Sequence, residues 1–232
     1  MHAGIEGLNS ELALRRLRTK VLRLEPDVVS IYIGWNDLMK FDPLAQTDAQ
    51  RMSGVARVLD KLWLVKGLRK LIFFHLRPYL APPATGPDSR TGRFRDFRPT
   101  VYEENLREMI ESVRSIGSRP ALLTLPSVVR SDMSPADLRA AGVIFPYFSS
   151  AYGVGDLLDL IAAYNASIRR IGSEDRVPVI DLAAVFEAVE DPTRYFFDTM
   201  HTGPAGRELI AQELYRGLER ERLLGPASAA AR

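Results

Sequence analysis

An aspartate and a histidine three positions apart have the types and spacing best suited to chemistry in this chain. Asp198 and His201 lie in the segment YFFDTMHTGPAG at residues 195–206, just before a helix start marked by Gly203 and Pro204. In one tight turn, a carboxylate holds an imidazole in one tautomer and stabilises the imidazolium formed when the ring takes a proton from a hydroxyl nucleophile. The pair therefore predicts half of a nucleophilic site; a solvated helix cap beside a surface histidine is the alternative.

The composition is that of an ordinary soluble globular protein. The chain has 232 residues, of which 46% are hydrophobic and 26% charged, and this predicts one large domain. A net charge of +2 is too small to predict a nucleic-acid partner. The absence of cysteine excludes disulfides, thiolate nucleophiles and thiolate metal sites. Because the sequence has neither a metal-ligand cluster nor a nucleotide fingerprint, we expect no metal and no cofactor.

Strand and helix patterns alternate along the chain, which predicts a parallel sheet with helices on both faces. The first helix is expected to begin at the capping residues Asn9 and Ser10 and to end at Pro26. Thr100 and Glu103 predict a capping box at the start of another helix. The expected strands span residues 27–34, 119–125 and 177–181, and the later helices residues 100–116, 156–171, 182–189 and 203–224, with a short helix starting at Ser134.

The first expected strand delivers polar residues to the edge where α/β sheets place their ligand sites. Its sequence, DVVSIYIG, shows little polar alternation, which predicts a strand buried on both faces. Gly34, Trp35, Asn36 and Asp37 follow at its carboxyl end, where open α/β sheets bind ligands. A strand-end turn is the alternative for Asn36 and Asp37.

A segment of basic amphipathic character interrupts the alternation. Residues 61–80 (KLWLVKGLRKLIFFHLRPYL) combine apolar side chains with five Lys and Arg residues. A core-packing helix with a solvated basic face is one interpretation, and contact with a membrane surface or a lipid substrate is the other.

Three short blocks, taken together, resemble the SGNH (GDSL) hydrolase family. Residues 34–37 (GWND) follow a buried strand and are similar to the family's G-x-N-D block. Residues 198–201 (DTMH) precede the last helix and are similar to its D-x-x-H block, while residues 2–7 (HAGIEG) are similar to its glycine block, with Gly7 in the place of the glycine. The resemblance implies a flavodoxin-like, SGNH-type parallel sheet with helices on both faces. It does not cover the region of about 47–98, which is therefore expected to be a helical and loop insertion in this domain.

The resemblance also implies the role of each matching residue. His201 would be the general base and Asp198 its orienting partner. The side-chain amide of Asn36 and the backbone N–H of Gly7 would donate to the oxyanion of an ester's tetrahedral intermediate. Trp35 and Asp37 are candidates for substrate contact, and Trp35 could instead simply pack.

The chain departs from the family pattern in its nucleophile, because no G-D-S sequence occurs in it. Ser10 lies near Gly7 but is expected to serve as a helix cap. Three strands are also few for a sheet of this type. We therefore expect residues 1–224 to form an SGNH-like domain that lacks its first strands, with a disordered tail at 225–232. The chain as given is expected to be soluble, and an upstream segment could supply an export signal or a membrane anchor.

Three functions from different classes follow from these patterns. The first is a serine ester hydrolase acting on an acyl ester or a carbohydrate O-acetyl ester, with the serine outside this chain. The second is a catalytically inactive relative kept as a binding or assembly module for a polysaccharide or lipid. The third is a membrane-surface protein that works through residues 61–80. The substrate identity and the oligomeric state do not follow from the sequence.

Overall fold

A computed structural model of the chain describes residues 7–39, 94–144 and 153–225. The described part alternates helices and short strands. The α-helices are α1 (Ser10–Arg16), α2 (Trp35–Met39), α7 (Thr100–Arg114), α8 (Pro135–Ala140), α9 (Val154–Glu174), α10 (Leu182–Glu187) and α11 (Pro204–Arg220). A π-helical turn (Leu17–Val21) and two 3₁₀ turns (Leu22–Leu24 and Pro192–Arg194) complete the helical segments. The strands are β1 (Val28–Ile31), β2 (Arg119–Leu123) and β3 (Val179–Ile180).

The three strands form one parallel sheet in the order β1-β2-β3. The register pairs Val28 with Arg119 in the first ladder, and Leu122 with Val179 in the second. All three expected strands are confirmed, and so is the parallel sheet of an α/β fold. Because the strands run in the same direction, their carboxyl ends meet at one edge of the sheet.

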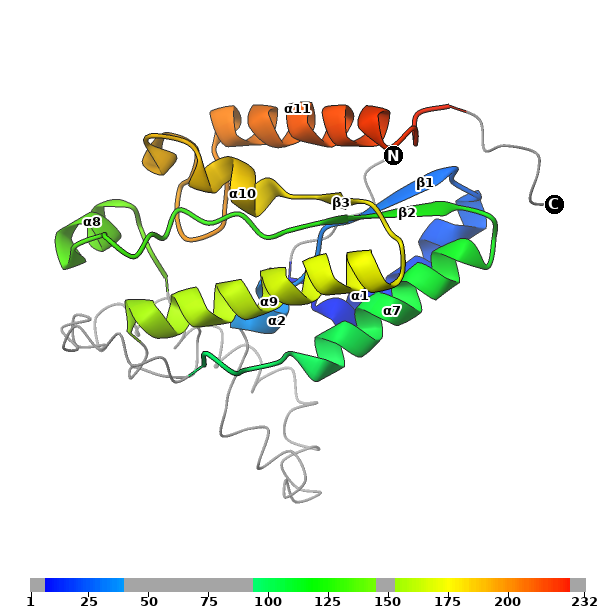
Figure 1. The fold of residues 1–232 in the computed structure, drawn as a ribbon, viewed down its shortest axis with the longest axis horizontal. Helices are drawn as coiled ribbons and strands as arrows, with labels where there is room; N and C mark the ends of the chain where they lie inside the picture. Colours follow the sequence, from blue (N-terminus) through cyan, green and yellow to red (C-terminus); the bar gives the residue numbers. More distant parts are fainter. Residues whose placement is uncertain (1–6, 40–93, 145–152, 226–232) are drawn as a thin grey trace, which may run out of the picture.

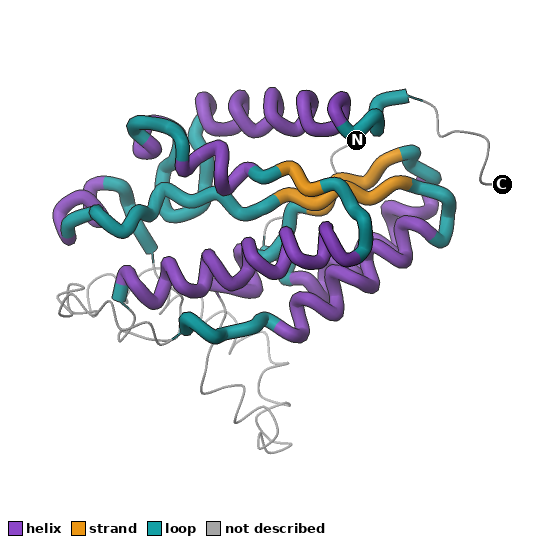
Figure 2. The backbone as a smooth tube through the Cα atoms, viewed as in Figure 1, coloured by secondary structure: helices purple, strands orange, loops and turns teal. Residues whose placement is uncertain are grey.

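Helices cover both faces of this sheet, as the alternation predicts (Figure 1). The helix α11 lies on one face, where its Ile210, Leu214 and Leu218 pack against a cluster that includes Ala121 and Ile180. On the other face, α1, α7 and α9 enclose the larger core, which contains the fully buried Leu122 and Leu160 among many others. Figure 2 shows the strands as a thin central layer between these helices.

The first helix, α1, is capped by Asn9 and begins at Ser10, so Ser10 is not its cap. Asn9 is the N-cap, because its side-chain oxygen accepts a hydrogen bond from the amide of Leu12 at 3.1 Å. Ser10 is the first residue inside α1 and is 1% exposed. The expectation that Ser10 caps this helix is therefore wrong, and its hydroxyl has another partner described below.

The capping box expected from Thr100 and Glu103 is also wrong. Pro99 occupies the N-cap position of α7 without a side-chain cap, and Thr100 is already helical. Glu103 points into the protein instead, where its carboxylate accepts a hydrogen bond from Ser167 at 2.7 Å and pairs with Arg170 at 2.6 Å. Burial favours the long-range partners on α9 over the local cap, because a buried carboxylate requires a charged partner.

The strand β1 is less buried than its apolar sequence predicts. Ser30 is exposed, and Val28 and Val29 are only half-buried. The reason is topological: β1 lies at the edge of the described sheet and pairs with β2 alone. A sequence typical of a central strand thus occupies an edge position.

Several expectations fall outside the described residues. They include most of the expected insertion at about 47–98, with its amphipathic stretch at 61–80, and the tail from residue 226 onward. Among the helices that the structure does describe, none is long and apolar enough to cross a membrane.

Candidate active site

Asp198 and His201 emerge from one closed turn between α10 and α11. An antiparallel bridge joins Phe196 to Thr202, and the amide of Phe197 donates to the carbonyl of His201 at 2.7 Å. The turn then continues directly into α11, with Gly203 as the N-cap. These bonds fix the backbone on either side of the pair, so the two side chains leave the same short turn.

The carboxylate of Asp198 holds the imidazole of His201 by Nδ1. Oδ2 of Asp198 lies 2.8 Å from Nδ1 of His201, and Oδ1 accepts hydrogen bonds from the amides of Met200 at 3.0 Å and His201 at 2.9 Å. Partial burial opposes ionisation of Asp198, but the two amide bonds and the imidazole outweigh it and lower the pKa of this carboxyl. Asp198 is therefore ionised at neutral pH and can only accept, so Nδ1 must carry the proton.

The remaining nitrogen of the imidazole is available for proton transfer. With Nδ1 protonated, Nε2 of His201 is the basic nitrogen. The His201 side chain is 66% exposed, whereas that of Asp198 is 25% exposed. The arrangement combines a fixed tautomer with an accessible base, which is what a general base requires.

Thr199, between the two functional residues, anchors the turn in the protein. Its side chain is fully buried; the hydroxyl donates to the carbonyl of Ile144 and accepts from the amide of Ile144, both at 2.7 Å. The carbonyl of Thr199 accepts from the hydroxyl of Ser127 at 2.9 Å and from the amide of Val128. Sequence reasoning did not identify this anchor, although Thr199 occupies an interior position of the D-x-x-H block. Ser127 and Val128 follow β2 and therefore connect the turn to the carboxyl edge of the sheet.

The second group of predicted residues follows β1. Gly34 has φ of +136°, and a Cβ at this position would lie 2.9 Å from Cδ1 of Leu125 and 3.3 Å from the ring of Tyr102. Only glycine combines this conformation with so close an approach. The glycine turn leads directly into α2, which presents Asn36 in its first turn. Asn36 is half-buried, and no described residue hydrogen-bonds its side-chain amide.

The structure brings the segment of Gly7 next to the segment of Asn36 through one strong contact. The amide of Ser10 donates to both oxygens of Asp37, at 3.0 and 2.9 Å, and the hydroxyl of Ser10 donates to Oδ1 at 2.6 Å. Asn105 donates to the same hydroxyl at 2.9 Å. Gly7, three residues before Ser10, is exposed and has φ of +79°. Asp37 of α2 thus binds the start of α1. This contact holds the segment that contains Gly7 close to the segment that contains Asn36, the two expected oxyanion donors.

The aromatic residues near the two groups differ in exposure. Trp35 is 9% exposed and belongs to the hydrophobic core, which favours packing over a substrate wall. Phe196 is buried against Phe186, with ring centroids 5.0 Å apart. Phe197, the residue before Asp198, is 66% exposed. The antiparallel bridge between Phe196 and Thr202 gives this segment a strand-like alternation, which buries Phe196 and directs Phe197 outward.

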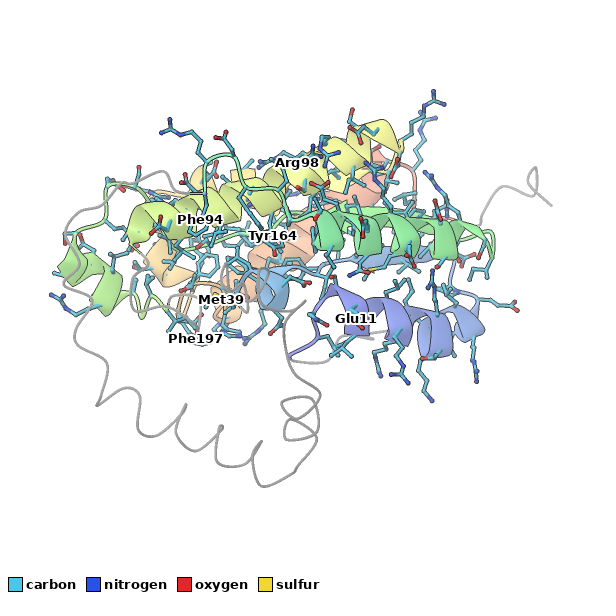
Figure 3. The ribbon with its side chains drawn as sticks, turned by 90° about the horizontal axis from the view of Figure 1, so that it is seen from below. Glu11, Met39, Phe94, Arg98, Tyr164 and Phe197 are labelled. Atoms are coloured by element: carbon cyan, nitrogen blue, oxygen red, sulfur yellow. The ribbon has the colours of Figure 1, made fainter. Side chains whose placement is uncertain are left out.

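Both groups lie beyond the carboxyl ends of the parallel strands. In Figure 1, α2 and the start of α11 both lie to the left of the strands, at the end of the sheet toward which β1 and β2 run. Figure 3, turned by 90°, places Met39 at the end of α2 and Phe197 beside the D-x-x-H turn at this same end. The described residues contain no group of three or more His, Asp or Glu side chains that could hold a metal ion.

Comparison with known proteins agrees with the α/β fold described above. The model of the GDSL-like Lipase/Acylhydrolase family matches residues 1–209. A solved GDSL-like lipase from Bacteroides thetaiotaomicron is 15% identical with a TM-score of 0.56, and the match covers 94% of this chain and 74% of the lipase. An acetyl xylan esterase is 17% identical with a TM-score of 0.52, covering 93% of this chain and 79% of the esterase.

A third solved structure, a catalytic mutant of an acetylxylan esterase from Geobacillus stearothermophilus, is 16% identical with a TM-score of 0.52. That match covers 93% of this chain and 69% of the esterase. At these identities, the similarity establishes a shared fold. No curated protein sequence matches the chain significantly.

Proposed function

The chain belongs to the GDSL-like lipase/acylhydrolase family, and on this basis we propose that it hydrolyses an ester through an acyl-enzyme. In this proposal, His201 is the general base and Asp198 orients it. The observation that carries the proposal is the contact of 2.8 Å between Oδ2 of Asp198 and Nδ1 of His201, which leaves Nε2 on an exposed ring. An aspartate in this position raises the rate of the reaction, because it fixes the tautomer of the histidine and stabilises the imidazolium.

The nucleophile of the proposed reaction is a serine outside these 232 residues. Ser10, which lies near Gly7 in sequence, is 1% exposed, and its hydroxyl already donates to Asp37. A nucleophilic hydroxyl must instead donate to the base and reach the substrate carbonyl. The absence of a G-D-S sequence agrees with this assignment.

The proposed reaction proceeds in two acyl-transfer steps. As the serine oxygen bonds to the ester carbonyl carbon, its proton passes to Nε2 of His201. The carbonyl oxygen becomes an oxyanion, which would accept hydrogen bonds from the side-chain amide of Asn36 and the backbone N–H of Gly7. The ester C–O bond then breaks, and His201 returns the proton to the leaving alcohol. Water repeats the sequence on the acyl-enzyme and releases the acid.

The substrate class proposed here is an acyl ester or a carbohydrate O-acetyl ester. Two of the similar solved structures are acetyl xylan esterases, and a third is a GDSL-like lipase. The exposed ring of Phe197 beside Asp198 offers an apolar surface at the site. Aromatic faces pack well against both acyl chains and the apolar faces of sugars.

The test is the intact mass of the protein isolated from its natural source after treatment with a fluorophosphonate, which tags activated serines. We expect a mass above that of these residues and a tag on a serine outside them. The same preparation should hydrolyse p-nitrophenyl acetate or acetylated xylo-oligosaccharides, and His201→Gln should abolish both tagging and hydrolysis. An untagged protein with the mass of this chain and no hydrolysis would contradict the proposal and favour an inactive binding module.

A further inference from the structure

The D-x-x-H turn is connected to the rest of the fold through one residue. Within the block of residues 198–201, Thr199 alone is buried, whereas Asp198 is half-buried and His201 is exposed. Among the described residues, every hydrogen bond from residues 197–201 to another segment ends on Thr199. The bonds of Asp198 stay inside the turn. The place of the turn in the fold therefore depends on Thr199 more than on either functional residue.

The hydroxyl of Thr199 binds both main-chain groups of one distant residue. It donates to the carbonyl of Ile144 and accepts from the amide of Ile144, both at 2.7 Å. If Thr199 only filled space in the interior, valine could replace it, because valine has nearly the same shape without the hydroxyl. Here that replacement would leave two main-chain groups without this partner. The hydroxyl is thus a two-point connection between the turn and the segment that contains Ile144.

The segment that receives this hydroxyl is fixed by α8. The amide of Gly142 donates to the carbonyl of Arg139 at 3.1 Å, and the amide of Val143 donates to the carbonyl of Leu138 at 2.9 Å. Gly142 has φ of +63°, the left-handed conformation that commonly ends a helix. Leu138 is buried in the larger core, and Figure 1 shows α8 beyond the carboxyl ends of the strands. The peptide groups of Ile144 therefore have a defined position next to the turn.

The same segment packs directly against the backbone of Asp198. A Cβ on Gly142 would lie 2.8 Å from the carbonyl oxygen of Phe197 and 3.7 Å from Cβ of Asp198. Thr199 lies between Asp198 and His201 in the chain, so a change in its backbone dihedrals rotates the two side chains relative to each other. A functional contact of 2.8 Å requires that both groups be held to within about 0.5 Å.

We propose that Thr199 is a positioning residue of the proposed general base. Its bonds to Ile144 hold the backbone in the conformation that keeps the carboxylate of Asp198 on Nδ1 of His201. This role rests on the proposed function, in which His201 is the base, but the contact between carboxylate and ring needs no substrate. A purely structural Thr199 would affect the stability of the protein and leave the tautomer of the ring unchanged.

The experiment measures the tautomer of neutral His201 in the full chain from its imidazole ¹⁵N chemical shifts. Thr199→Val removes the hydroxyl and keeps the shape of the side chain. We expect the ratio of rings protonated at Nδ1 to rings protonated at Nε2 to fall about tenfold, the factor for losing half the strength of a charge-assisted hydrogen bond. Thr199→Ser keeps the hydroxyl and should restore the ratio.

Thr124→Val is the matched control, because Thr124 is also a fully buried threonine whose hydroxyl both donates and accepts. It donates to Oδ1 of Asp181 at 2.9 Å and accepts from the amide of Ala183 at 2.8 Å, outside the D-x-x-H turn. We expect this variant to lower the stability of the protein, as Thr199→Val does, and to leave the tautomer ratio of His201 unchanged.

A second variant tests the same support if Thr199→Val does not fold. The methyl of Gly142→Ala must displace the carbonyl of Phe197, so this variant should also lower the ratio. An unchanged ratio in Thr199→Val, or in Gly142→Ala where it takes its place, would overturn the proposal. So would a ratio in Thr199→Ser as low as that with valine, or an equal fall in Thr124→Val. Because the measurement needs no nucleophile, a failure to hydrolyse esters would count against the proposed function alone.

Discussion

The tautomer of a single imidazole decides whether the candidate site can act as a base. Nδ1 of His201 lies 2.8 Å from an ionised carboxylate, which can only accept a hydrogen bond. We predict that neutral His201 is protonated at Nδ1. An amide in place of the carboxylate can donate to Nδ1 instead, so Asp198→Asn should shift the neutral ring toward protonation at Nε2. In an active preparation this change should lower kcat by on the order of ten-thousandfold.

The imidazole ¹⁵N chemical shifts measure this prediction directly, even in a preparation without a nucleophile. The two other histidines of the chain, His2 and His75, give internal reference signals. Equal tautomer populations in the two proteins would show that Asp198 does not control the ring of His201.

The side-chain amide of Asn36 has no hydrogen-bond partner in the described part of the chain. An unused donor of this kind contributes little to stability, and we predict that Asn36→Ala changes the free energy of unfolding by less than about 0.5 kcal/mol. If the amide binds the oxyanion, the same change should lower kcat about a hundredfold or more with little change in KM. Steady-state kinetics and urea unfolding of the two proteins separate these effects. A higher KM at unchanged kcat would assign Asn36 to substrate binding instead.

The contacts of the site between residues close in the sequence could be predicted, whereas its contacts between distant residues could not. The pair of Asp198 and His201 could be identified from the sequence because a separation of three positions fits within one turn. The anchor of this turn could not, since Thr199 binds Ile144 across 55 positions of the chain. Ser10 illustrates the same limit, because its actual partner, Asp37, lies 27 positions away. Residue types indicate the chemistry of a site, whereas partners that are distant in the sequence can be identified only from the fold.

The carboxylate of Glu103 contributes a buried polar contact between α7 and α9. It accepts a hydrogen bond from Ser167 and pairs with Arg170, both on α9. We predict that Glu103→Gln, which keeps an acceptor but removes the charge, lowers the free energy of unfolding by about 1–3 kcal/mol. Urea unfolding at neutral pH measures the change. Glu104→Gln, at an exposed neighbouring position, is the control and should have almost no effect.

The same carboxyl sets a dependence of stability on pH. Burial opposes ionisation of Glu103, but the hydrogen bonds and charges of Arg170, Ser167 and Arg98 lower its pKa below the ordinary value of 4.5. A lowered pKa in the folded state gives stability that is present above 4.5 and is lost as the pH falls through the folded value. The unfolding free energy of Glu103→Gln should therefore fall less steeply below pH 4.5 than that of the unmodified protein. Parallel acid profiles would assign the acid sensitivity to other carboxyls.

At the level of elements, the apolar pattern together with Pro and Gly residues was sufficient to predict the order of strands and helices. It was not sufficient to predict which residues are buried or which residues cap the helices. The three strands and the start of α11 after Gly203 could be predicted because Pro, Gly and short apolar runs act locally. The exposure of Ser30 could not, because it depends on which strands lie beside β1. The position of Glu103 could not either, because its partners on α9 lie more than 60 positions away.

The close stacking of the molecule's layers depends on two glycines on opposite sides of β3. Gly172 of α9 packs against Val179, and Gly217 of α11 packs against Ile180. A Cβ on Gly217 would lie 2.6 Å from Cγ1 of Ile180, and a Cβ on Gly172 would overlap Cγ2 of Val179. Neighbouring side chains of one short strand thus point into two different helices. The distance of α9 and of α11 from the sheet is therefore set at Gly172 and Gly217, where each helix has no side chain.

This stacking reverses the usual effect of alanine in a helix. At an open position, Gly→Ala stabilises a helix by about 0.8–1 kcal/mol, because alanine loses less backbone entropy on folding. At Gly217 the added methyl must push α11 away from Ile180, so we predict that Gly217→Ala lowers the free energy of unfolding by about 1–3 kcal/mol. Gln212→Ala, at an exposed position of the same helix, should stay within about 0.5 kcal/mol of the unmodified protein. Urea unfolding of the three proteins measures this difference. A more stable Gly217→Ala protein would mean that α11 moves freely over the sheet, and the D-x-x-H turn at its start would then not be held in place by the packing of the layers.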